Sequence, residues 1–519
     1  MTSADLARDI LSSLAAQGVL EIVLAPGSRN APLAFAAYDA AEAGLFRLHT
    51  RIDERSAGFL ALGLTKVGSR AAVITTSGSA VANLAPSAAE AAHSGVPVVY
   101  LTADRPASVR GTNANQTTDQ LGLLGPLVPV LDVTGPPELP QVGPVHLNVP
   151  FAPPLVPADR WHPDPVERPE RRRTWPSTEL LANGPRTVVV AGDDAGPPAR
   201  VLAEKGRWPL LAEPTSGSRT GGVALRCYRL LLDGPLGAEV ERVVVVGRPT
   251  LSRPVQTLLA RDDVEVVSVP PVGAWNERPF PVDRAAPGFD VAGPDDDAWL
   301  DRWLTADVSA GAALDGLLAE QAGLTPYDVA GAVSAAVPPN GLLFVGASNP
   351  IRDLDLMVAR YDVGDRRKVI ANRGLSGIDG IVSSAIGAAL GRRSSRSLAL
   401  IGDVTLLHDQ GGLVLPHDNP RPDLTIVVVN DDGGSIFATL EQGAAEFADR
   451  YDRLFGTPHG VDVAALCAAS RIPHWRVNSR MELEHALASP AGGIEVVEAV
   501  VGRADRRELD LAIRALRAD

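Results

Sequence analysis

Cysteine is scarce in this sequence. Cys227 and Cys467 are the two cysteines among 519 residues, and neither has a partner at the spacing of a metal site. A disulfide framework and a zinc centre are therefore not expected, and the chain is predicted to work in a reducing compartment, the cytoplasm. Apolar runs are also short. None reaches the ~18–20 residues that cross a bilayer, so no membrane partner is expected.

Positive charge is in deficit as well. The 48 Lys and Arg residues face 62 Asp and Glu residues, which gives a net charge of −14. Proteins that bind nucleic acid usually present a basic face, so nucleic acid is not an expected partner. A small anionic substrate stays compatible with this charge, because a few well-placed arginines can oppose the overall sign.

Three series of short apolar runs organise the chain. With only 4% aromatic residues, the cores must be built mainly from Ala, Val and Leu, and 519 residues should form about three of them. In the first series the runs alternate with helical patterns at 31–42, 54–66 and 79–93, which is typical of buried parallel strands. The expected strands lie at 22–25, 71–74, 96–101 and 145–149, then at 187–191, 209–213, 242–247 and 264–270, and finally at 342–346, 368–372, 397–402, 424–430 and 494–501.

The predicted fold class is therefore α/β, with three parallel-sheet domains at 1–155, 181–310 and 325–519. Residues 156–180 are expected to be a linker, and another Asp-, Gly- and Pro-rich linker stretch lies within 275–325. Arg171, Arg172 and Arg173 in the first linker could form an anion patch, but the nearby Glu167 and Glu170 favour a solvated linker.

Acidic residues follow two strands of the third series. Asp403 comes after the run 397–402, and Asp431 comes directly after the run 424–430. Carboxyl ends of parallel strands meet at one edge of a sheet, where α/β proteins bind ligands. Asp403, Asp431 and a backbone carbonyl near Gly433 could thus hold Mg²⁺, which prefers oxygen ligands and often shares them with phosphates. The alternative is a pair of acidic strand ends with no ligand.

The spacing of these segments resembles the thiamine-diphosphate motif that begins Gly-Asp-Gly and ends Asn-Asn. Here Gly402 and Asp403 match, Val404 replaces the last Gly, and Asp431 replaces the last Asn. Since Asp and Asn both offer an oxygen to Mg²⁺, the departures do not remove the predicted function. Mn²⁺ is a possible substitute metal.

Thiamine chemistry also needs a carboxylate in another domain. It hydrogen-bonds the aminopyrimidine of the cofactor and favours the imino form, which deprotonates the thiazolium carbon. Glu54 fits this role, because it opens a predicted helix just after a short strand. A helix-opening acid that merely suits the helix dipole is the alternative.

Over nearly its whole length the sequence resembles the 2-succinyl-5-enolpyruvyl-6-hydroxy-3-cyclohexene-1-carboxylate synthases of menaquinone biosynthesis. The most specific of the matching segments is 372–380, whereas in the middle of the chain only 247–253 matches. There Ser252 stands where the family can have Lys. The other segments that carry the resemblance are 25–29, 53–55, 102–106, 115–116 and 348–352.

The resemblance implies that 2-oxoglutarate is decarboxylated on thiamine diphosphate and that the carbanion adds to isochorismate in a 1,4 sense. The two substrates carry four carboxylates, for which Arg is the bidentate partner. The implied succinyl-binding residues are Ser348, Arg352 and Arg373. The implied isochorismate-binding residues are Ser28, Arg29, Arg105, Asn115, Gln116 and Arg253.

The resemblance also assigns the cofactor residues and the assembly. Glu54 and Gln116 are the expected catalytic residues, and Ile378 would wedge the cofactor into its bent shape. Ile436, Phe437 and Leu440 would wall the site. The expected cofactor contacts are Glu54, Ser77, Gly78, Ile378, Gly402, Asp403, Val404, Thr405, Ser435 and Ile436. In this family the two half-sites come from different chains, so a homodimer or homotetramer with sites at the subunit interface is expected.

Three rival functions stay open at this stage. An acetolactate-synthase type of 2-oxo acid decarboxylase would keep the cofactor, but pyruvate needs only one carboxylate partner. A non-catalytic α/β homologue is opposed by the intact Glu54, Asp403 and Asp431. A dinucleotide-dependent oxidoreductase lacks a full glycine fingerprint, and the turn at 192–196 does not supply one. His49 and His146 have no partner at metal spacing and are interpreted as ordinary hydrogen-bonded histidines.

Overall fold

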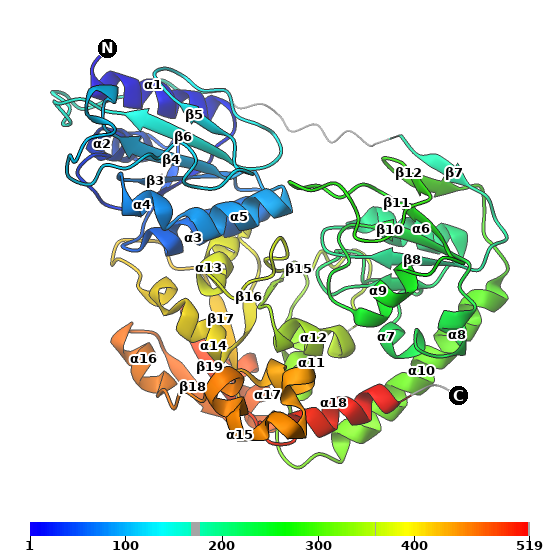
Figure 1. The fold of residues 1–519 in the computed structure, drawn as a ribbon. Helices are drawn as coiled ribbons and strands as arrows, with labels where there is room; N and C mark the ends of the chain where they lie inside the picture. The colour runs from blue at the N-terminus through cyan, green and yellow to red at the C-terminus, as the bar shows by residue number, and fades with distance from the viewer. Residues whose placement is uncertain (168–176, 359, 517–519) are drawn as a thin grey trace.

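Three parallel sheets follow one another along the chain and form three lobes (Figure 1). The computed structural model describes residues 1–167, 177–358 and 360–516. Arg171, Arg172 and Arg173 lie outside these ranges, so their interpretation stays a prediction. No helix in the described ranges is both long enough and apolar enough to cross a membrane.

The N-terminal sheet has six strands in the order β2-β1-β3-β4-β6-β5, all paired in parallel. Its central strands are buried on both faces, as the continuous apolar runs predict. The strands are β1 (Glu21–Leu24), β2 (Arg47–Thr50), β3 (Ala71–Thr75), β4 (Val99–Asp104), β5 (Val130–Asp132) and β6 (Val145–Pro150). The helices are α1 (Ser3–Ala16), α2 (Ala31–Glu42), α3 (Glu54–Lys66), α4 (Ser79–Ala82) and α5 (Ala85–Ser94).

Proline explains two differences from the predicted N-terminal elements. The helix expected at 79–93 is two helices, and Pro86 lies in the first turn of the second, where its missing N–H costs nothing. The strand expected from residue 96 begins at Val99, because Pro97 cannot donate to a ladder.

The middle sheet has five parallel strands in the order β12-β11-β10-β8-β9, and β7 pairs with β13 beside it. Its strands are β7 (Glu179–Leu181), β8 (Thr187–Ala191), β9 (Leu210–Ala212), β10 (Arg242–Val246), β11 (Glu265–Ser268), β12 (Arg284–Ala285) and β13 (Phe289–Val291). The helices are α6 (Pro197–Gly206), α7 (Tyr228–Leu231), α8 (Pro235–Ala238), α9 (Arg253–Leu259) and α10 (Asp297–Ala319).

The linker stretch expected within 275–325, at 293–297, ends in a helix start. A 23-residue helix, α10, begins there and runs along the outside of the middle lobe toward the C-terminal lobe (Figure 1). The acidic cluster before it is a helix start, because the Asp296 side chain accepts a hydrogen bond from the Ala298 amide.

The C-terminal sheet has six parallel strands in the order β15-β14-β16-β17-β19-β18. Its strands are β14 (Leu342–Val345), β15 (Lys368–Ile370), β16 (Ser397–Gly402), β17 (Leu424–Asn430), β18 (His474–Val477) and β19 (Ile494–Val500). The helices are α11 (Pro326–Ala336), α12 (Asn349–Met357), α13 (Ile381–Arg392), α14 (Asp403–His408), α15 (Ala448–Tyr451), α16 (Val463–Ala469), α17 (Arg480–Ala488) and α18 (Arg506–Ala515). The predicted fold class is confirmed, while the predicted domain boundaries stay predictions.

A glycine seam joins the N- and C-terminal sheets through α3 and α13, which pack side by side (Figure 1). A Cβ atom at Gly63 would lie 2.0 Å from the carbonyl oxygen of Ser384, and one at Gly387 would lie 2.2 Å from that of Leu60. The helices can approach this closely only because both positions lack a side chain. Buried residues of the two domains, such as Phe59 and Ile386, accordingly share one hydrophobic core.

Candidate active site

Glu54 opens α3, directly after β2 and one short turn. Asp53 caps the helix by accepting a hydrogen bond from the Arg55 amide at 2.8 Å. The Glu54 carboxylate accepts a hydrogen bond from Asn83 Nδ2 at 3.0 Å, and its residue is half-buried. Sequence reasoning missed Asn83, which lies between α4 and α5 and belongs to no motif. The structure thus gives Glu54 an oriented carboxylate at a helix start.

A polar cluster lies at the carboxyl ends of β3 and β4. Arg105 donates through Nη1 to the Ser77 hydroxyl and, at 2.7 Å, to the Gln116 carbonyl. Gln116 returns a hydrogen bond from Nε2 to the Ser77 carbonyl at 2.8 Å, and the Gly78 amide donates to Gln120 at 2.9 Å. The predicted residues Ser77, Gly78, Arg105 and Gln116 therefore come together, although they are separated by up to 39 positions.

Arg29 lies near Arg105 at the same edge of the N-terminal sheet. Its Nη1 donates to the Phe151 carbonyl at 3.0 Å. Burial, and next the positive charge of Arg105, lower the pKa of Arg29. Two guanidinium groups thus lie close enough to repel each other, and an anion placed there would relieve the repulsion. Ser28 and Asn115 are exposed on neighbouring loops.

Asp403 and Asp431 lie at the ends of β16 and β17, as the sequence predicts. Asp403 is buried and accepts the amides of Val404 at 2.7 Å and Gly433 at 2.9 Å. Burial raises the pKa of Asp403 despite these donors. Burial, and next the charge of Asp403, raise the pKa of Asp431 to about 7.

These two carboxylates fit a divalent cation, which would remove their repulsion. Groups of three or more His, Cys, Asp or Glu side chains suited to a metal do not occur in the described part of the chain. Side chains alone would therefore leave the coordination shell incomplete. That suits a hard cation that shares backbone and phosphate oxygens, as expected for Mg²⁺.

Gly433 turns the chain beside Asp403 with φ of 143°. A Cβ atom there would lie 2.1 Å from the Gly456 carbonyl oxygen, so this position requires glycine. His459 completes the surroundings: its Nε2 lies 3.1 Å from Asp403 Oδ2, and its amide donates to Asp432 at 3.0 Å. Sequence reasoning missed His459, since a lone histidine 56 residues beyond Asp403 gives no spacing signal.

The remaining predicted cofactor residues lie around the two aspartates. Gly402 ends β16, Val404 and Thr405 form the first turn of α14, and Ser435 and Ile436 begin a short 3₁₀ helix. Asn349 was not predicted, yet its Nδ2 donates to the Ser435 hydroxyl at 2.8 Å. Ile378 is half-buried on the loop before α13. Its predicted role stays a prediction.

Arg352 and Arg373 form a second pair of neighbouring guanidinium groups. Arg352, in the first turns of α12, donates to the Ser348 carbonyl at 2.6 Å. Ser348 has a φ of 72°, a left-handed conformation that is rare outside glycine and marks a strained helix start. Burial, and next the charge of Arg373, lower the pKa of Arg352. Arg373 itself is 3% exposed.

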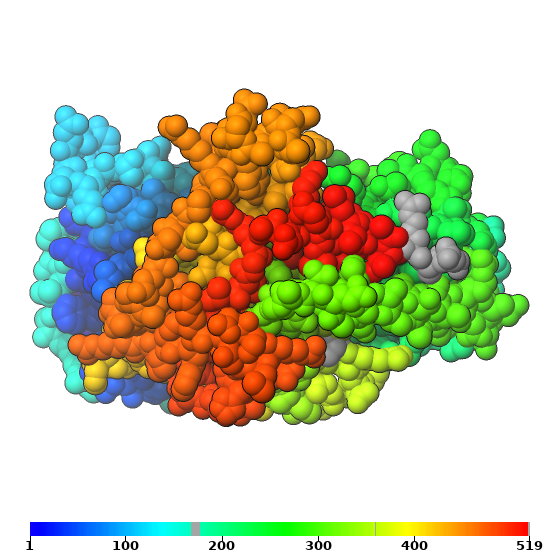
Figure 2. All heavy atoms as spheres, turned by 90° about the horizontal axis from the view of Figure 1, so that it is seen from below, coloured from blue at the N-terminus to red at the C-terminus, as the bar shows by residue number. Residues whose placement is uncertain are grey.

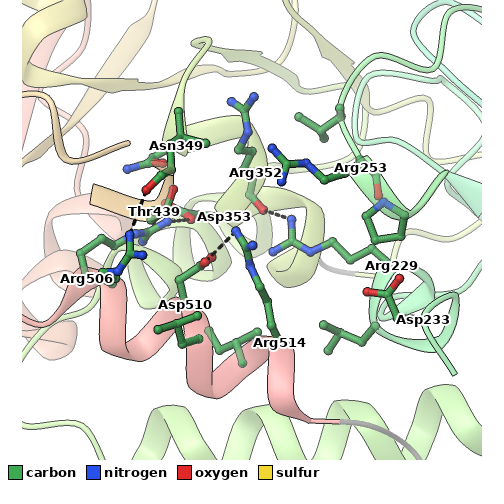
Figure 3. Close-up of a pocket in the computed structure, with 18 of the residues that line it drawn as sticks. Arg229, Asp233, Arg253, Asn349, Arg352, Asp353, Thr439, Arg506, Asp510 and Arg514 are labelled. Carbon is green, nitrogen blue, oxygen red and sulfur yellow. Dashed lines mark hydrogen bonds and ion pairs between the residues drawn. The ribbon is translucent and has the colours of Figure 1, made fainter. Parts of the chain in front are cut away.

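A cavity of about 600 Å³ opens between the middle and C-terminal domains beside Arg352. Arg229 and Arg253 reach into it from the middle domain toward Arg352 (Figure 3). Arg253 is exposed in the first turn of α9, and Leu440 also lines the cavity, whereas Phe437 packs on Phe455 with 5.7 Å between ring centroids.

The helix α18 closes one side of the cavity and is hydrogen-bonded to the segment 438–440 beside it. Arg507 donates to the carbonyls of Ala438 at 2.6 Å and Leu440 at 2.9 Å. Arg506 forms a buried ion pair with Asp353 of α12 at 2.5 Å (Figure 3). Just before the helix, Arg503 donates to the Asp432 carbonyl at 3.0 Å. Figure 2 shows α18 (red) lying against α10 (green) where the middle and C-terminal lobes meet.

Other expectations about polar residues are also met. His49 lies 2.9 Å from Glu21, and His146 lies 2.7 Å from Thr102, so both are hydrogen-bonded residues of the N-terminal sheet. Burial lowers the pKa of His146 to about 4, which keeps that ring neutral.

Comparison with known families agrees with this arrangement. Residues 4–123 match the thiamine pyrophosphate enzyme, N-terminal TPP binding domain, and residues 353–498 match the thiamine pyrophosphate enzyme, C-terminal TPP binding domain. The first range holds Glu54 and the second holds Asp403 and Asp431. Fold and site together define a thiamine-diphosphate-dependent enzyme.

Relatives narrow this class to one family. The chain is 68% identical over 522 residues to the 2-succinyl-5-enolpyruvyl-6-hydroxy-3-cyclohexene-1-carboxylate synthase of Nocardioides sp. (strain ATCC BAA-499 / JS614), with 98% of this chain and 97% of that one covered. It is 45% identical over 540 residues to the synthase of the same name from Kineococcus radiotolerans, with 96% of each chain covered. For that of Arthrobacter sp. (strain FB24) the identity is 44% over 557 residues, with 99% and 92% covered. The chain belongs to this family of synthases.

Proposed function

We propose that this enzyme is a transferase that decarboxylates 2-oxoglutarate and adds the remaining four-carbon unit to isochorismate. The product would be 2-succinyl-5-enolpyruvyl-6-hydroxy-3-cyclohexene-1-carboxylate, the compound in the relatives' names, an intermediate of menaquinone biosynthesis. A cytoplasmic location stays a prediction from the low cysteine content.

The observation that carries the proposal is the pairing of arginines in two places. Arg29 lies near Arg105 in the N-terminal domain, and Arg352 lies near Arg373 in the C-terminal domain. No carboxylate lies within ion-pair distance of these four groups in the described ranges. Neighbouring guanidinium groups that have no ion-pair partner repel each other, and they suit substrates that bring several carboxylates.

The cofactor residues would divide between the two halves. Asp403, Asp431 and a carbonyl near Gly433 would hold Mg²⁺, or Mn²⁺ in its place, together with the diphosphate. When bound, thiamine diphosphate supplies a carbon nucleophile for the 2-oxo group and takes up the electrons released with CO₂. Glu54, oriented by Asn83, would hold a proton at the pyrimidine ring of the cofactor.

The substrate residues would act through charge and exclusion of water. Ser348, Arg352 and Arg373 would bind the far carboxylate of 2-oxoglutarate, and Ile436, Phe437 and Leu440 would keep water from the reacting carbon. Ser28, Arg29, Arg105, Asn115, Gln116 and Arg253 would bind isochorismate. Gln116 would also orient the acceptor during addition.

A second copy of the chain would complete each site, in a homodimer or homotetramer. Within one chain, the charged groups that shift Arg29 come from the N-terminal domain, while those that shift Arg352 come from the middle and C-terminal domains. Neither arginine pair perturbs the other within one chain, although the N-terminal domain touches the Arg373 loop through Glu90. This supports a site formed between subunits.

Mixing two inactive variants tests the shared site. Chains with Glu54→Gln and chains with Asp403→Ala are each expected to be inactive, and re-associated mixtures should recover activity. A mixed dimer then has one site with both changes and one with neither. No recovery in a mixture shown to exchange subunits would refute the shared site.

Product mass spectrometry tests the reaction. Protein with thiamine diphosphate, Mg²⁺, 2-oxoglutarate and isochorismate should give the succinylated cyclohexene product, and omission of the cofactor should abolish it. Release of CO₂ from 2-oxoglutarate without the product would move the doubt to the acceptor. Neither signal, in protein that binds the cofactor, would refute the proposed function.

A further inference from the structure

The loop that carries Arg373 is held by the two other domains. Arg373 donates through Nη2 to the Thr250 hydroxyl of the middle domain at 2.6 Å. The next two residues turn to the N-terminal domain: the amides of Gly374 and Leu375 donate to the Glu90 carboxylate at 2.7 and 2.6 Å. Glu90 is 3% exposed in α5. Three domains therefore meet at one substrate-binding arginine.

Thr250 is itself fixed by a buried carboxyl. Glu213, one residue beyond β9, is 3% exposed, and its Oε1 accepts the amides of Thr250 at 2.9 Å and Leu251 at 2.8 Å. Removing a carboxyl from water is costly and raises the pKa of Glu213, and the two amides together with the nearby positive charge of Arg373 offset only part of that cost. The same loop, 248–253, ends in Arg253, which lines the cavity.

We propose that Glu213 and Glu90 are positioning residues for Arg373, and that Glu213 acts through Thr250. This inference rests on the proposed function, since it takes Arg373 as a ligand of the 2-oxoglutarate carboxylate. Neither carboxyl touches substrate. Glu213 holds the backbone at 250–251, and Glu90 holds the backbone at 374–375. The Thr250 hydroxyl then orients the guanidinium group of Arg373.

Orientation matters here because Arg373 is otherwise under-constrained. Its Nε has no hydrogen-bond partner among the described residues, so the Thr250 bond is the contact that fixes the plane of the group. A guanidinium binds a carboxylate through two parallel N–H bonds only when the planes agree. A loop that shifts by about 1 Å loses that match, and with it affinity for the substrate.

Four variants and one control test the proposal in the full-length enzyme loaded with thiamine diphosphate and Mg²⁺. Thr250→Val removes the hydroxyl at an exposed position, so this variant is expected to fold normally. Thr250→Ser keeps the hydroxyl. Glu213→Ala and Glu90→Ala remove the two anchors. The control is Glu495→Ala, which removes a carboxyl that is equally buried but does not contact this loop. The Glu495 carboxyl accepts a hydrogen bond of 3.0 Å from the Ala491 amide.

The readout is the KM for 2-oxoglutarate and kcat, measured from CO₂ release. Thr250→Val, Glu213→Ala and Glu90→Ala should raise KM at least about fivefold with kcat within about threefold. Thr250→Ser should restore the wild-type KM, and Glu495→Ala should leave KM unchanged even if it lowers the thermal midpoint. A purely structural role would lower stability without this split between KM and kcat.

Arg373→Ala separates the two ways of failing. If it raises KM for 2-oxoglutarate while Thr250→Val and Glu90→Ala do not, the positioning role is refuted and the proposed function survives. If Arg373→Ala itself leaves KM unchanged, the assignment of Arg373 fails, and the positioning proposal fails with it.

Discussion

Adding one methyl group at Gly387 should push the N- and C-terminal domains apart. An alanine Cβ there would lie 2.2 Å from the Leu60 carbonyl oxygen and 3.0 Å from the Leu64 amide nitrogen, where ordinary contact begins at 3.4 Å. The helices α3 and α13 must therefore separate by about 1 Å along a shared core. Overpacking of this kind costs ~1–3 kcal/mol. Alanine recovers about 1 kcal/mol of helix propensity. The clash is with backbone atoms that cannot rotate away, so the cost lies in the upper part of that range and a net loss of about 1–2 kcal/mol is expected.

Urea unfolding followed by circular dichroism measures this loss, and a second helical glycine provides the control. Gly316 lies within α10, where an added Cβ would meet nothing within 4 Å. Gly316→Ala should therefore stabilise the chain by about 0.5–1 kcal/mol. The same Gly→Ala change is thus expected to lower the free energy of unfolding at position 387 and to raise it at position 316. A Gly387→Ala protein as stable as the wild type, with Gly316→Ala behaving as expected, would refute the close packing of this seam.

Three further predictions concern the site. Glu54→Gln should keep thiamine diphosphate affinity within about threefold but lower kcat at least ~10²-fold, because an amide cannot exchange the proton. The control is Glu42→Gln, a change at an exposed glutamate. Equal turnover in both variants would contradict the assigned role. Asp431→Asn should retain Mg²⁺-dependent cofactor binding, whereas Asp431→Ala should weaken it at least about tenfold. Cofactor titration at fixed Mg²⁺ measures both affinities. Equal cofactor affinities of the two variants would exclude Asp431 as a metal ligand. Burial raises the pKa of Glu213 to about 8 from its ordinary 4.5, so its stabilising contribution is complete below pH 4.5 and is lost as the pH rises through about 8. Glu213→Gln should therefore match the wild-type urea midpoint near pH 4.5 and exceed it at pH 8.5, and a difference that does not change with pH would contradict this.

Strands and strand ends could be predicted well because buried parallel strands leave a strong signal. The runs around Val188 and Val427 are continuous and apolar, and the residues that follow them fall at sheet edges as topology requires. The placement of Asp403 and Asp431 followed from this alone. Short edge strands such as β12 carried no such signal, and the acidic start of α10 was mistaken for linker because capping residues are also turn residues.

Partners brought in from distant segments could not be predicted. Asn83 reaches Glu54 across 29 positions, and His459 reaches Asp403 across 56. Neither has a periodicity or a spacing that single-sequence reasoning can use. The same holds for Glu90, which meets the Arg373 loop 284 positions later. Motifs in the sequence therefore suggest candidates for the chemistry more readily than they identify the residues that hold those candidates in place.

The helix α18 lies near the C-terminus and contacts the segment that lines the cavity. Arg507 on the helix donates to the carbonyls of Ala438 and Leu440, and Arg503 just before the helix donates to that of Asp432. Force applied to the helix would therefore reach the segment 432–440 directly. Met1, by contrast, is exposed on the N-terminal lobe, away from α18 (Figure 1). An enzyme tethered to a bead or fused to a reporter should keep its activity when attached through Met1 and lose part of it when attached behind α18.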